Sequence, residues 1–188
     1  MTPDPDRRQI IFLNGTTSSG KTSLAKALLP ILPEPFFYLS VDSFNSMRDQ
    51  RYMDAEELSE VLERTVRGFH RAVTGMVGAG NNVVVDHVLR ERSWLIDCLN
   101  LFDGGDVVFV GVHCALPELE RRERLRGDRV PGRAAYQLER VHAHTLYDVE
   151  CATDTNTPSE CAELILSAVT SPSVSRAFDR MQAGDRPS

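Results

Sequence analysis

The sequence predicts an α/β fold in which helices cover both faces of a doubly wound, mostly parallel sheet of about five strands. Short apolar runs alternate with longer helix-like segments along the chain, which is the pattern of parallel strands joined by crossover helices. The runs are almost continuously apolar, as expected of strands that are buried on both faces. The length of 188 residues, with 41% hydrophobic and 26% charged residues, fits one globular domain.

Each predicted strand is a short run rich in β-branched and aromatic residues. The clear strands are residues 9–14, 36–41, 83–86 and 107–112, and a weaker one is residues 147–153. Each predicted helix is a longer segment, and several of them end at a glycine or a proline. The helices are residues 21–29, 55–77, 91–102, 117–125, 133–146 and 158–169, the last with Thr157 as N-cap and Pro158 at its first position.

These elements place one domain at residues 9–170, preceded by a short extension at residues 1–8. Residues 171–188 are rich in Ser, Pro and Arg, and we expect a loosely held or disordered tail there. A short helix over residues 174–181 is the alternative for this tail.

The net charge of the chain argues against some classes of partner. There are 27 acidic and 21 basic residues, with only two lysines among the basic ones, and the net charge is −6. This balance argues against a general nucleic-acid or membrane-surface binder. No signal-like or membrane-spanning apolar stretch stands out, so we expect a cytoplasmic protein. The four cysteines form no CxxC pair, and we expect reduced thiols rather than zinc ligands or disulfides.

A phosphate-loop motif follows the first strand and leads directly into the first helix. It reads GTTSSGKT, fits the pattern GxxxxGK[ST], and consists of Gly15, Thr16, Thr17, Ser18, Ser19, Gly20, Lys21 and Thr22. The glycines of such a loop let backbone amides surround phosphate oxygens, and the helix N-terminus adds its positive dipole. We expect these residues to bind a nucleoside triphosphate, with Lys21 at the β and γ phosphates and the Thr22 hydroxyl on Mg²⁺.

Two acidic residues follow strands at the sheet edge where ligands of parallel sheets bind. Asp42 follows the second strand and Asp86 closes the third. Phosphoryl transfer needs Mg²⁺ and a group that deprotonates the acceptor hydroxyl, so we assign Asp42 as the catalytic base and Asp86 as a direct or water-mediated Mg²⁺ ligand. The two roles could be exchanged. The structural alternatives are an N-cap for Asp42 and a hydrogen-bonded loop acid for Asp86.

Residues 121–133 carry six arginines and two acids. Two glycines and a proline break the helix within this segment, and we expect a mobile lid whose arginines fold over the bound triphosphate. Arg126 and Arg129 flank the break and are assigned as catalytic, whereas Arg133 is a weaker candidate that we place at the nucleotide. The arginines of the preceding helix should face solvent or pair with neighbouring acids; these are Arg121, Arg122 and Arg124, with Glu118, Glu120 and Glu123.

Several segments together resemble the chloramphenicol phosphotransferase-like family over residues 10–169. They read IFLNG, GTTSSGKT, LPEP, VDSF, VVVDH, GVHC, RGDRVPG and YDVE. The resemblance implies a P-loop, nucleoside-kinase-like fold with strand order 2-3-1-4-5 and an arginine-bearing lid. It also implies that ATP and Mg²⁺ serve a reaction in which a primary hydroxyl of chloramphenicol is phosphorylated.

The same resemblance implies that Asp42 is the base and that Arg126 and Arg129 are the arginines of the lid. Residues 44–73 differ from the family, being shorter and more charged than the stretch that closes over the drug. Their charged residues, among them Arg48 and Asp49, suggest a more polar acceptor than chloramphenicol.

The main hypothesis is therefore an ATP-dependent phosphotransferase that acts on a hydroxyl of a small molecule. The alternatives are a kinase of a nucleoside, a nucleotide or a polynucleotide 5′-hydroxyl, and a non-catalytic nucleotide-binding module. A role in antibiotic resistance, the choice between ATP and GTP, and the oligomeric state stay open.

Overall fold

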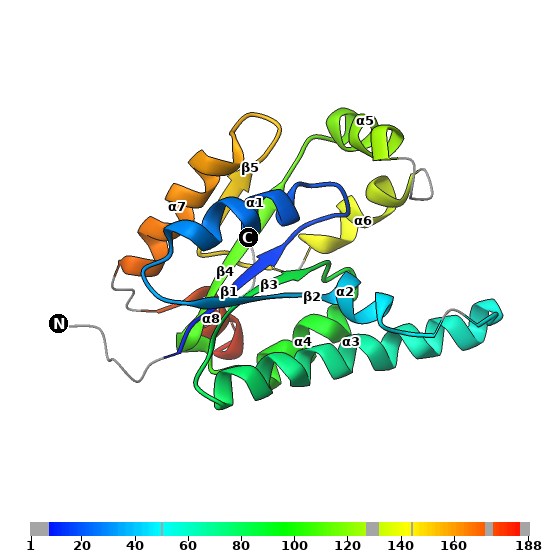
Figure 1. The fold of residues 1–188 in the computed structure, drawn as a ribbon, viewed down its shortest axis with the longest axis horizontal. Coiled ribbons are helices and arrows are strands. Elements are labelled where there is room, and N and C mark those ends of the chain that lie inside the picture. The colour runs from blue at the N-terminus through cyan, green and yellow to red at the C-terminus, as the bar shows by residue number, and fades with distance from the viewer. Residues whose placement is uncertain (1–7, 50, 127–131, 144, 172–174, 185–188) are drawn as a thin grey trace.

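The computed structural model describes residues 8–49, 51–126, 132–143, 145–171 and 175–184. At its centre is a five-stranded parallel sheet with the order β2-β3-β1-β4-β5 (Figure 1). The strands are β1 (Ile10–Asn14), β2 (Phe36–Ser40), β3 (Asn82–His87), β4 (Val107–His113) and β5 (Val149–Ala152). The predicted fold class and strand order are confirmed.

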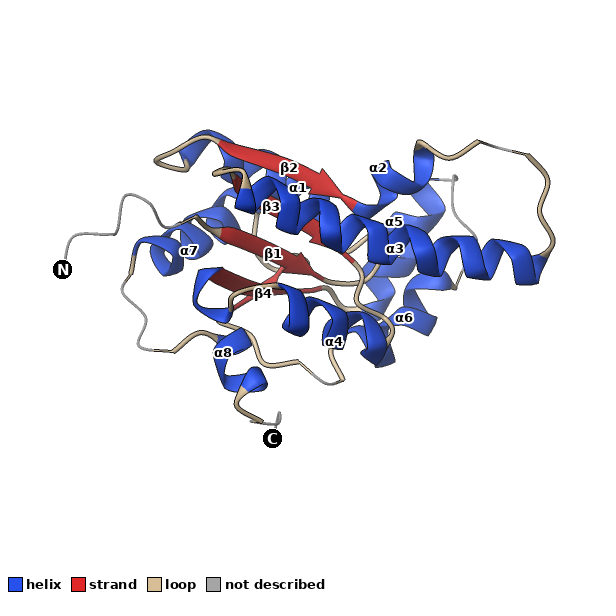
Figure 2. Cartoon of the chain, turned by 90° about the horizontal axis from the view of Figure 1, so that it is seen from below, coloured by secondary structure: helices blue, strands red, loops and turns tan. Residues whose placement is uncertain are grey.

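Helices cover both faces of the sheet, as Figures 1 and 2 show. One face carries α1 (Lys21–Leu28) and α7 (Pro158–Thr170), and the other carries α3 (Ala55–Gly78), α4 (Arg92–Leu101) and α8 (Ala177–Gln182). Successive residues of β1 point to opposite faces: Phe12 packs among α3, α4 and α8, and Leu13 packs among α1 and α7. All of β1 is buried, and the phosphate loop follows directly from this central strand of the sheet.

Three further helices lie beyond the carboxyl ends of the strands (Figure 1). They are α2 (Val41–Ser46), α5 (Leu116–Arg126) and α6 (Arg133–Val141). Two short 3₁₀ helices cover Leu29–Ile31 and Gly104–Asp106.

The second strand is shorter than predicted, and the helix that follows it was not predicted. The last pair between β2 and β3 joins Ser40 and Asp86, so the chain has no strand partner beyond this point. It turns into α2 at Val41, and Asp42 lies in the first helical turn. A carboxylate is favourable there because the helix dipole is positive at its N-terminus.

The helix predicted over residues 133–146 ends at Val141 instead. The side chain of Asn14 donates from Nδ2 to the Val141 carbonyl oxygen at 2.9 Å and to the Tyr147 hydroxyl at 2.8 Å. The Tyr147 oxygen also lies 2.7 Å from His142 Nδ1. These bonds join Tyr147 and the end of α6 to Asn14, the last residue of β1.

The C-terminal tail contains a helix, α8, that packs into the core. Asp148 accepts hydrogen bonds from the Phe109 amide and from the Ala177 amide, both at 2.8 Å. Phe178 is fully buried, with its ring 4.9 Å from that of Phe109. This part of the tail is therefore held against β4.

All four cysteines are free and buried, as the sequence predicted: Cys98, Cys114, Cys151 and Cys161. In the described ranges, every helix is too short or too polar to cross a lipid bilayer.

We predict that His142 makes the fold less stable in acid. Burial, followed by His113 and Lys21, lowers the pKa of His142 from 6.5 to about 3. Between these two values the unfolded chain binds a proton that the fold excludes, so the free energy of unfolding falls as the pH drops below 6.5. At pH 5 the loss from this residue should reach up to about 2 kcal/mol.

Urea unfolding at pH 7 and pH 5 measures this loss. His142→Gln keeps a hydrogen-bonding side chain but has no ring to titrate, so its stability should depend less steeply on pH than that of the wild type. Equal pH dependence in the two proteins would contradict the prediction.

Candidate active site

The phosphate loop joins β1 to α1, and its backbone conformation explains its glycines. Gly20 has a φ of +94°, in the left-handed region that glycine adopts readily. At Gly15 a Cβ atom would lie 2.4 Å from the Val112 carbonyl oxygen, which would force the loop away from β4. Both glycines of the motif are therefore required by the shape of the loop.

Lys21 is the first residue of α1, and only 7% of it is exposed. Its Nζ donates to the carbonyl oxygens of Gly15 at 2.9 Å and Thr16 at 2.8 Å. The same ammonium lies 3.7 Å from Asp86 Oδ1. The loop thus holds a buried positive charge at its centre, where a phosphate-binding loop needs it.

The structure brings the two predicted metal ligands together. Asp86 Oδ2 accepts hydrogen bonds from the Thr22 hydroxyl at 3.0 Å and from the Tyr38 hydroxyl at 2.7 Å. Burial, and then the charge of Asp86, raises the pKa of Tyr38 to about 12, so this phenol remains a donor. A hydroxyl and a carboxylate are hard oxygen ligands that suit Mg²⁺, which also retains water and phosphate oxygens.

The described residues contain no group of three or more His, Cys, Asp or Glu side chains that could hold a metal by themselves. A cation at Thr22 and Asp86 would therefore need ligands from a bound nucleotide. Tyr38 was not predicted as part of the site; it lies on β2 and reaches Asp86 because β2 and β3 are neighbours.

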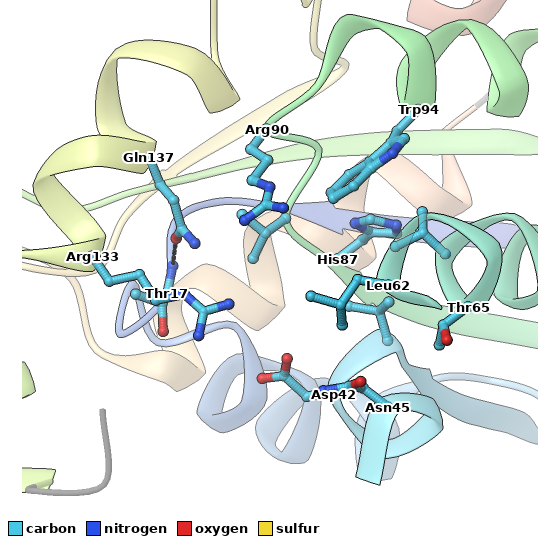
Figure 3. Close-up of a pocket in the computed structure, with 13 residues that line it drawn as sticks. Thr17, Asp42, Asn45, Leu62, Thr65, His87, Arg90, Trp94, Arg133 and Gln137 are labelled. Carbon is cyan, nitrogen blue, oxygen red and sulfur yellow. Dashed lines mark hydrogen bonds between the residues drawn. The ribbon is translucent and has the colours of Figure 1, made fainter. Parts of the chain in front are cut away.

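Two cavities open at the carboxyl ends of the strands. The phosphate groove, of about 530 Å³, is lined by the phosphate loop, α1 and α5; its polar lining includes Lys21, Thr22, Asp86, Arg122 and Arg126. The side cavity, of about 70 Å³, lies between α2, α3 and α6; it is lined by Thr17, Val41, Asp42, Asn45, Leu62, Thr65, Val66, His87, Val88, Arg90, Trp94, Arg133 and Gln137 (Figure 3).

Asp42 lines both cavities, together with Thr17, Val41 and Val88. Its carboxylate faces the side cavity in Figure 3, on the side where the phosphate loop passes. A group in this position can contact a molecule in the side cavity and still lie beside phosphates bound at the loop.

Arg133, which we expected at the nucleotide, lines the side cavity and is not among the residues that line the phosphate groove. It extends from the first turn of α6 toward Asp42 (Figure 3). Gln137, one turn later on the same helix, accepts a hydrogen bond from the Thr17 amide at 2.7 Å. This bond fixes α6 against the phosphate loop.

A chain of hydrogen bonds connects the wall of the side cavity to the surface. His87 Nε2 lies 3.0 Å from His70 Nε2, and His70 Nδ1 lies 2.7 Å from Asp97 Oδ2. Burial lowers the pKa of His70, and burial followed by the neighbouring ring of His70 lowers the pKa of His87. Both rings are therefore neutral at pH 7, and His87 adds no positive charge to the cavity.

The arginines of α5 divide between those that reach the phosphate groove and those that do not. Arg126 is exposed at the end of α5 and lines the groove. Arg122 pairs with Glu118 as predicted, but it also donates to the carbonyl oxygen of Thr153 at 2.7 Å and to that of Ser18 at 3.4 Å. Arg122 and Arg126 are four residues apart, so they lie on one face of α5. This spacing is the sequence signal that could have placed Arg122 at the groove beside Arg126.

Arg129 lies outside the described residues, as does the whole of residues 127–131. Glu123, predicted to pair with an arginine, is only 4% exposed and accepts hydrogen bonds from the amides of Gly132 at 3.2 Å and Ala134 at 2.8 Å. It caps the N-terminus of α6 and joins that helix to α5.

Comparison with known proteins gives a family and a fold. The sequence model of the family described as "Chloramphenicol phosphotransferase-like protein" matches residues 8–170. A protein of Mycobacterium tuberculosis strain H37Rv, named "Putative O-phosphotransferase Rv2636", is 30% identical over 197 residues, covering 93% of this chain and 88% of the relative.

Solved kinases share the fold at low sequence identity. The APS kinase CysC of Mycobacterium tuberculosis, in complex with AMPPNP and APS, has a TM-score of 0.68 and 17% identity, covering 89% of this chain and all of that one. A gluconokinase from Sinorhizobium meliloti has a TM-score of 0.56 and 15% identity, covering 88% of this chain and 93% of that one.

Asp86→Asn should weaken nucleotide binding only when Mg²⁺ is present. Asparagine can still accept hydrogen bonds from Thr22 and Tyr38, but it has no charge to offer a cation. We expect the dissociation constant for ATP to rise roughly tenfold or more with Mg²⁺, and to change little in EDTA.

Calorimetric titration under both conditions measures the effect. The exposed acid Glu163 of α7 lies outside both cavities, so Glu163→Gln is a matched control that should leave binding unchanged. Equal weakening of the Asp86 variant in Mg²⁺ and in EDTA would assign Asp86 to positioning Lys21 rather than to a metal.

Proposed function

Because the chain belongs to the chloramphenicol phosphotransferase-like family, we propose that it transfers the γ-phosphate of ATP to a hydroxyl group of a small molecule. The observation that carries this proposal is the position of Asp42, which lines both the phosphate groove and the side cavity. One cavity then holds the phosphate donor and the other holds the acceptor. The carboxylate between them is the base.

The proposed nucleotide site is the phosphate groove. The backbone amides of the loop and the ammonium of Lys21 would bind the β and γ phosphates, and Thr22 and Asp86 would hold Mg²⁺. Bound there, Mg²⁺ supplies charge neutralisation for the transferring group. The hydrogen bond between the Thr22 hydroxyl and Asp86 supports this position for Mg²⁺, since it brings two oxygen ligands within 3.0 Å of each other.

The proposed transfer is direct. The acceptor hydroxyl lies in the side cavity, and Asp42 takes its proton as the hydroxyl oxygen bonds to the γ-phosphorus and the bond from that phosphorus to the β–γ bridging oxygen breaks. The electron pair of the broken bond leaves with ADP, and the products are a phosphate monoester, ADP and one proton.

Arg126 and Arg129 are proposed to neutralise the charge of the transferring phosphoryl group when the lid covers the groove. The position of Arg126 at the groove supports this role. Arg122 is a third candidate for the same task, because it already contacts the backbone of the phosphate loop at Ser18.

The identity of the acceptor is a separate question. The relative is named for O-phosphotransfer, and the APS kinase structure holds AMPPNP together with APS. Of these three proteins and families, only the family carries chloramphenicol in its description. The side cavity, at about 70 Å³, favours an acceptor more compact than a drug-sized molecule.

Asp42→Asn should lower kcat about 10²-fold or more while the dissociation constant for ATP changes little, because a base acts in transfer rather than in nucleotide binding. Phosphorylation with γ-labelled ATP, using an acceptor found among hydroxyl-bearing antibiotics, sugars and nucleosides, measures the rate.

Asp49→Asn is the matched control. Asp49 is an exposed acid shortly after α2, paired with Arg51, and it lines neither cavity. A near-normal rate in the Asp42 variant would move the base to another residue, with Asp86 the first candidate. ATP binding without turnover on any acceptor would favour a non-catalytic nucleotide-binding module.

A further inference from the structure

We propose that the acceptor of this phosphotransferase carries an anionic group, which Arg90 and Arg133 bind in the side cavity. The inference rests on the proposed function and specifies its substrate class: a compact alcohol that bears a phosphate, sulfate or carboxylate group. Neither guanidinium is needed for an uncharged acceptor such as chloramphenicol.

The two arginines enter the side cavity from different elements. Arg90 lies in the loop between β3 and α4, and Arg133 is the first residue of α6. Figure 3 shows both guanidinium groups turned into the cavity, with Asp42 below them and Thr17 beside Arg133. A ligand that touches the Asp42 carboxylate with its hydroxyl can therefore reach both arginines with another group.

Arg90 is held in place without using all of its donors. Its guanidinium carbon lies 5.0 Å from the centroid of the Trp94 ring, so the ring supports the planar group. Its ion pair with Glu91 is long, at 3.4 Å from Nε to Oε1, and almost half of the Glu91 side chain is exposed. Nε is buried without a hydrogen-bond partner among the described residues. A stacked guanidinium with unused in-plane donors is a ready binding group for an oxyanion.

Arg133 has no hydrogen bond or ion pair to any residue that the structure describes. The α6 helix that carries it is fixed on both sides, by Gln137 on the phosphate loop and by Glu123 at its N-terminus. Its backbone is therefore positioned, while its charged end remains available to a ligand.

The charges around the side cavity do not balance. Among the lining residues that the structure describes, Asp42 is the one acid, against Arg90 and Arg133; Glu91, which pairs with Arg90 at 3.4 Å, is not part of the lining. The nearby carboxylate of Glu63 accepts from Trp94 Nε1 at 2.6 Å and pairs with Arg67, so it is already occupied. A neutral alcohol that filled the cavity would displace water from the two guanidinium groups without replacing that hydration. An anionic acceptor would instead compensate the lost hydration with ion pairs.

The uncharged part of the cavity lining indicates the chemistry of the rest of the acceptor. Leu62, Val66 and Trp94 form an apolar wall that suits a short carbon skeleton. The hydroxyl would then point to Asp42 and the anionic group to the arginines. Because the arginine fork binds two oxygens of one group, it would also orient the acceptor for in-line attack.

A fractionated metabolite extract tests the charge of the acceptor before its chemical identity is established. Small molecules from the source organism are separated on an anion exchanger into a retained, anionic fraction and an unretained one. Each fraction is incubated with the protein and γ-labelled ATP, with the Lys21→Ala variant as the inactive control. We expect a labelled product from the retained fraction.

The outcomes separate the two proposals. Transfer to a compound of the unretained fraction would overturn the anionic acceptor and leave the phosphotransferase standing. Transfer to neither fraction would contradict both proposals.

Variants test the two arginines with the acceptor so found. Arg90→Gln and Arg133→Gln should each raise the KM for the acceptor tenfold or more and leave the KM for ATP within about twofold. Arg92→Gln on α4 and Arg140→Gln on α6 are matched controls, since both are exposed and line neither cavity. A raised KM for ATP in the Arg133 variant would return this residue to the nucleotide site, and an unchanged acceptor KM in both variants would refute the inference.

Discussion

The register of the strands around β3 is the constraint on which the site depends. Asp86 pairs with Leu13 of β1 on one side and with Ser40 of β2 on the other. The phosphate loop starts two residues after Leu13, and α2 starts directly after Ser40. A shift of one residue between β1 and β3 would turn Asp86 to the opposite face of the sheet, away from Lys21 and Thr22, and a shift between β2 and β3 would turn Tyr38 away from Asp86. One register therefore places the loop, the acid beside it and the helix that carries Asp42.

The charged side chains at the carboxyl ends of the strands add little to the stability of the fold, but they can bind a charged ligand. Lys21 and Asp86 lie 3.7 Å apart, and their side chains are only 7% and 9% exposed. Such a pair contributes little to stability once the cost of removing both charges from water is counted. Arg90 and Arg133 add two more cations in the adjacent cavity. The net charge of −6 conceals this local excess of positive charge, which a bound nucleotide and an anionic acceptor would neutralise.

Local patterns in the sequence were enough to predict the sheet, most of its helices and the phosphate loop, because each depends on residues adjacent in the chain. The strand order came from a family resemblance. The end of α6 could not be predicted, since it depends on Asn14 and Tyr147, which are 133 residues apart and meet through a hydrogen bond. The roles of Tyr38, Arg90 and Gln137 likewise depend on which strands and helices become neighbours. Arg122 differs, because its spacing of four from Arg126 was visible in the sequence.

The property on which every proposed role depends is the binding of MgATP at the phosphate loop, next to Asp86 and the side cavity. Hydrogen–deuterium exchange of the wild-type protein, with and without MgATP, tests it most directly. We expect slower exchange in peptides that cover residues 15–22 and 86–90, with smaller changes in the helices on the sheet faces, such as α7. Unchanged exchange over residues 15–22 at saturating MgATP would contradict this binding site.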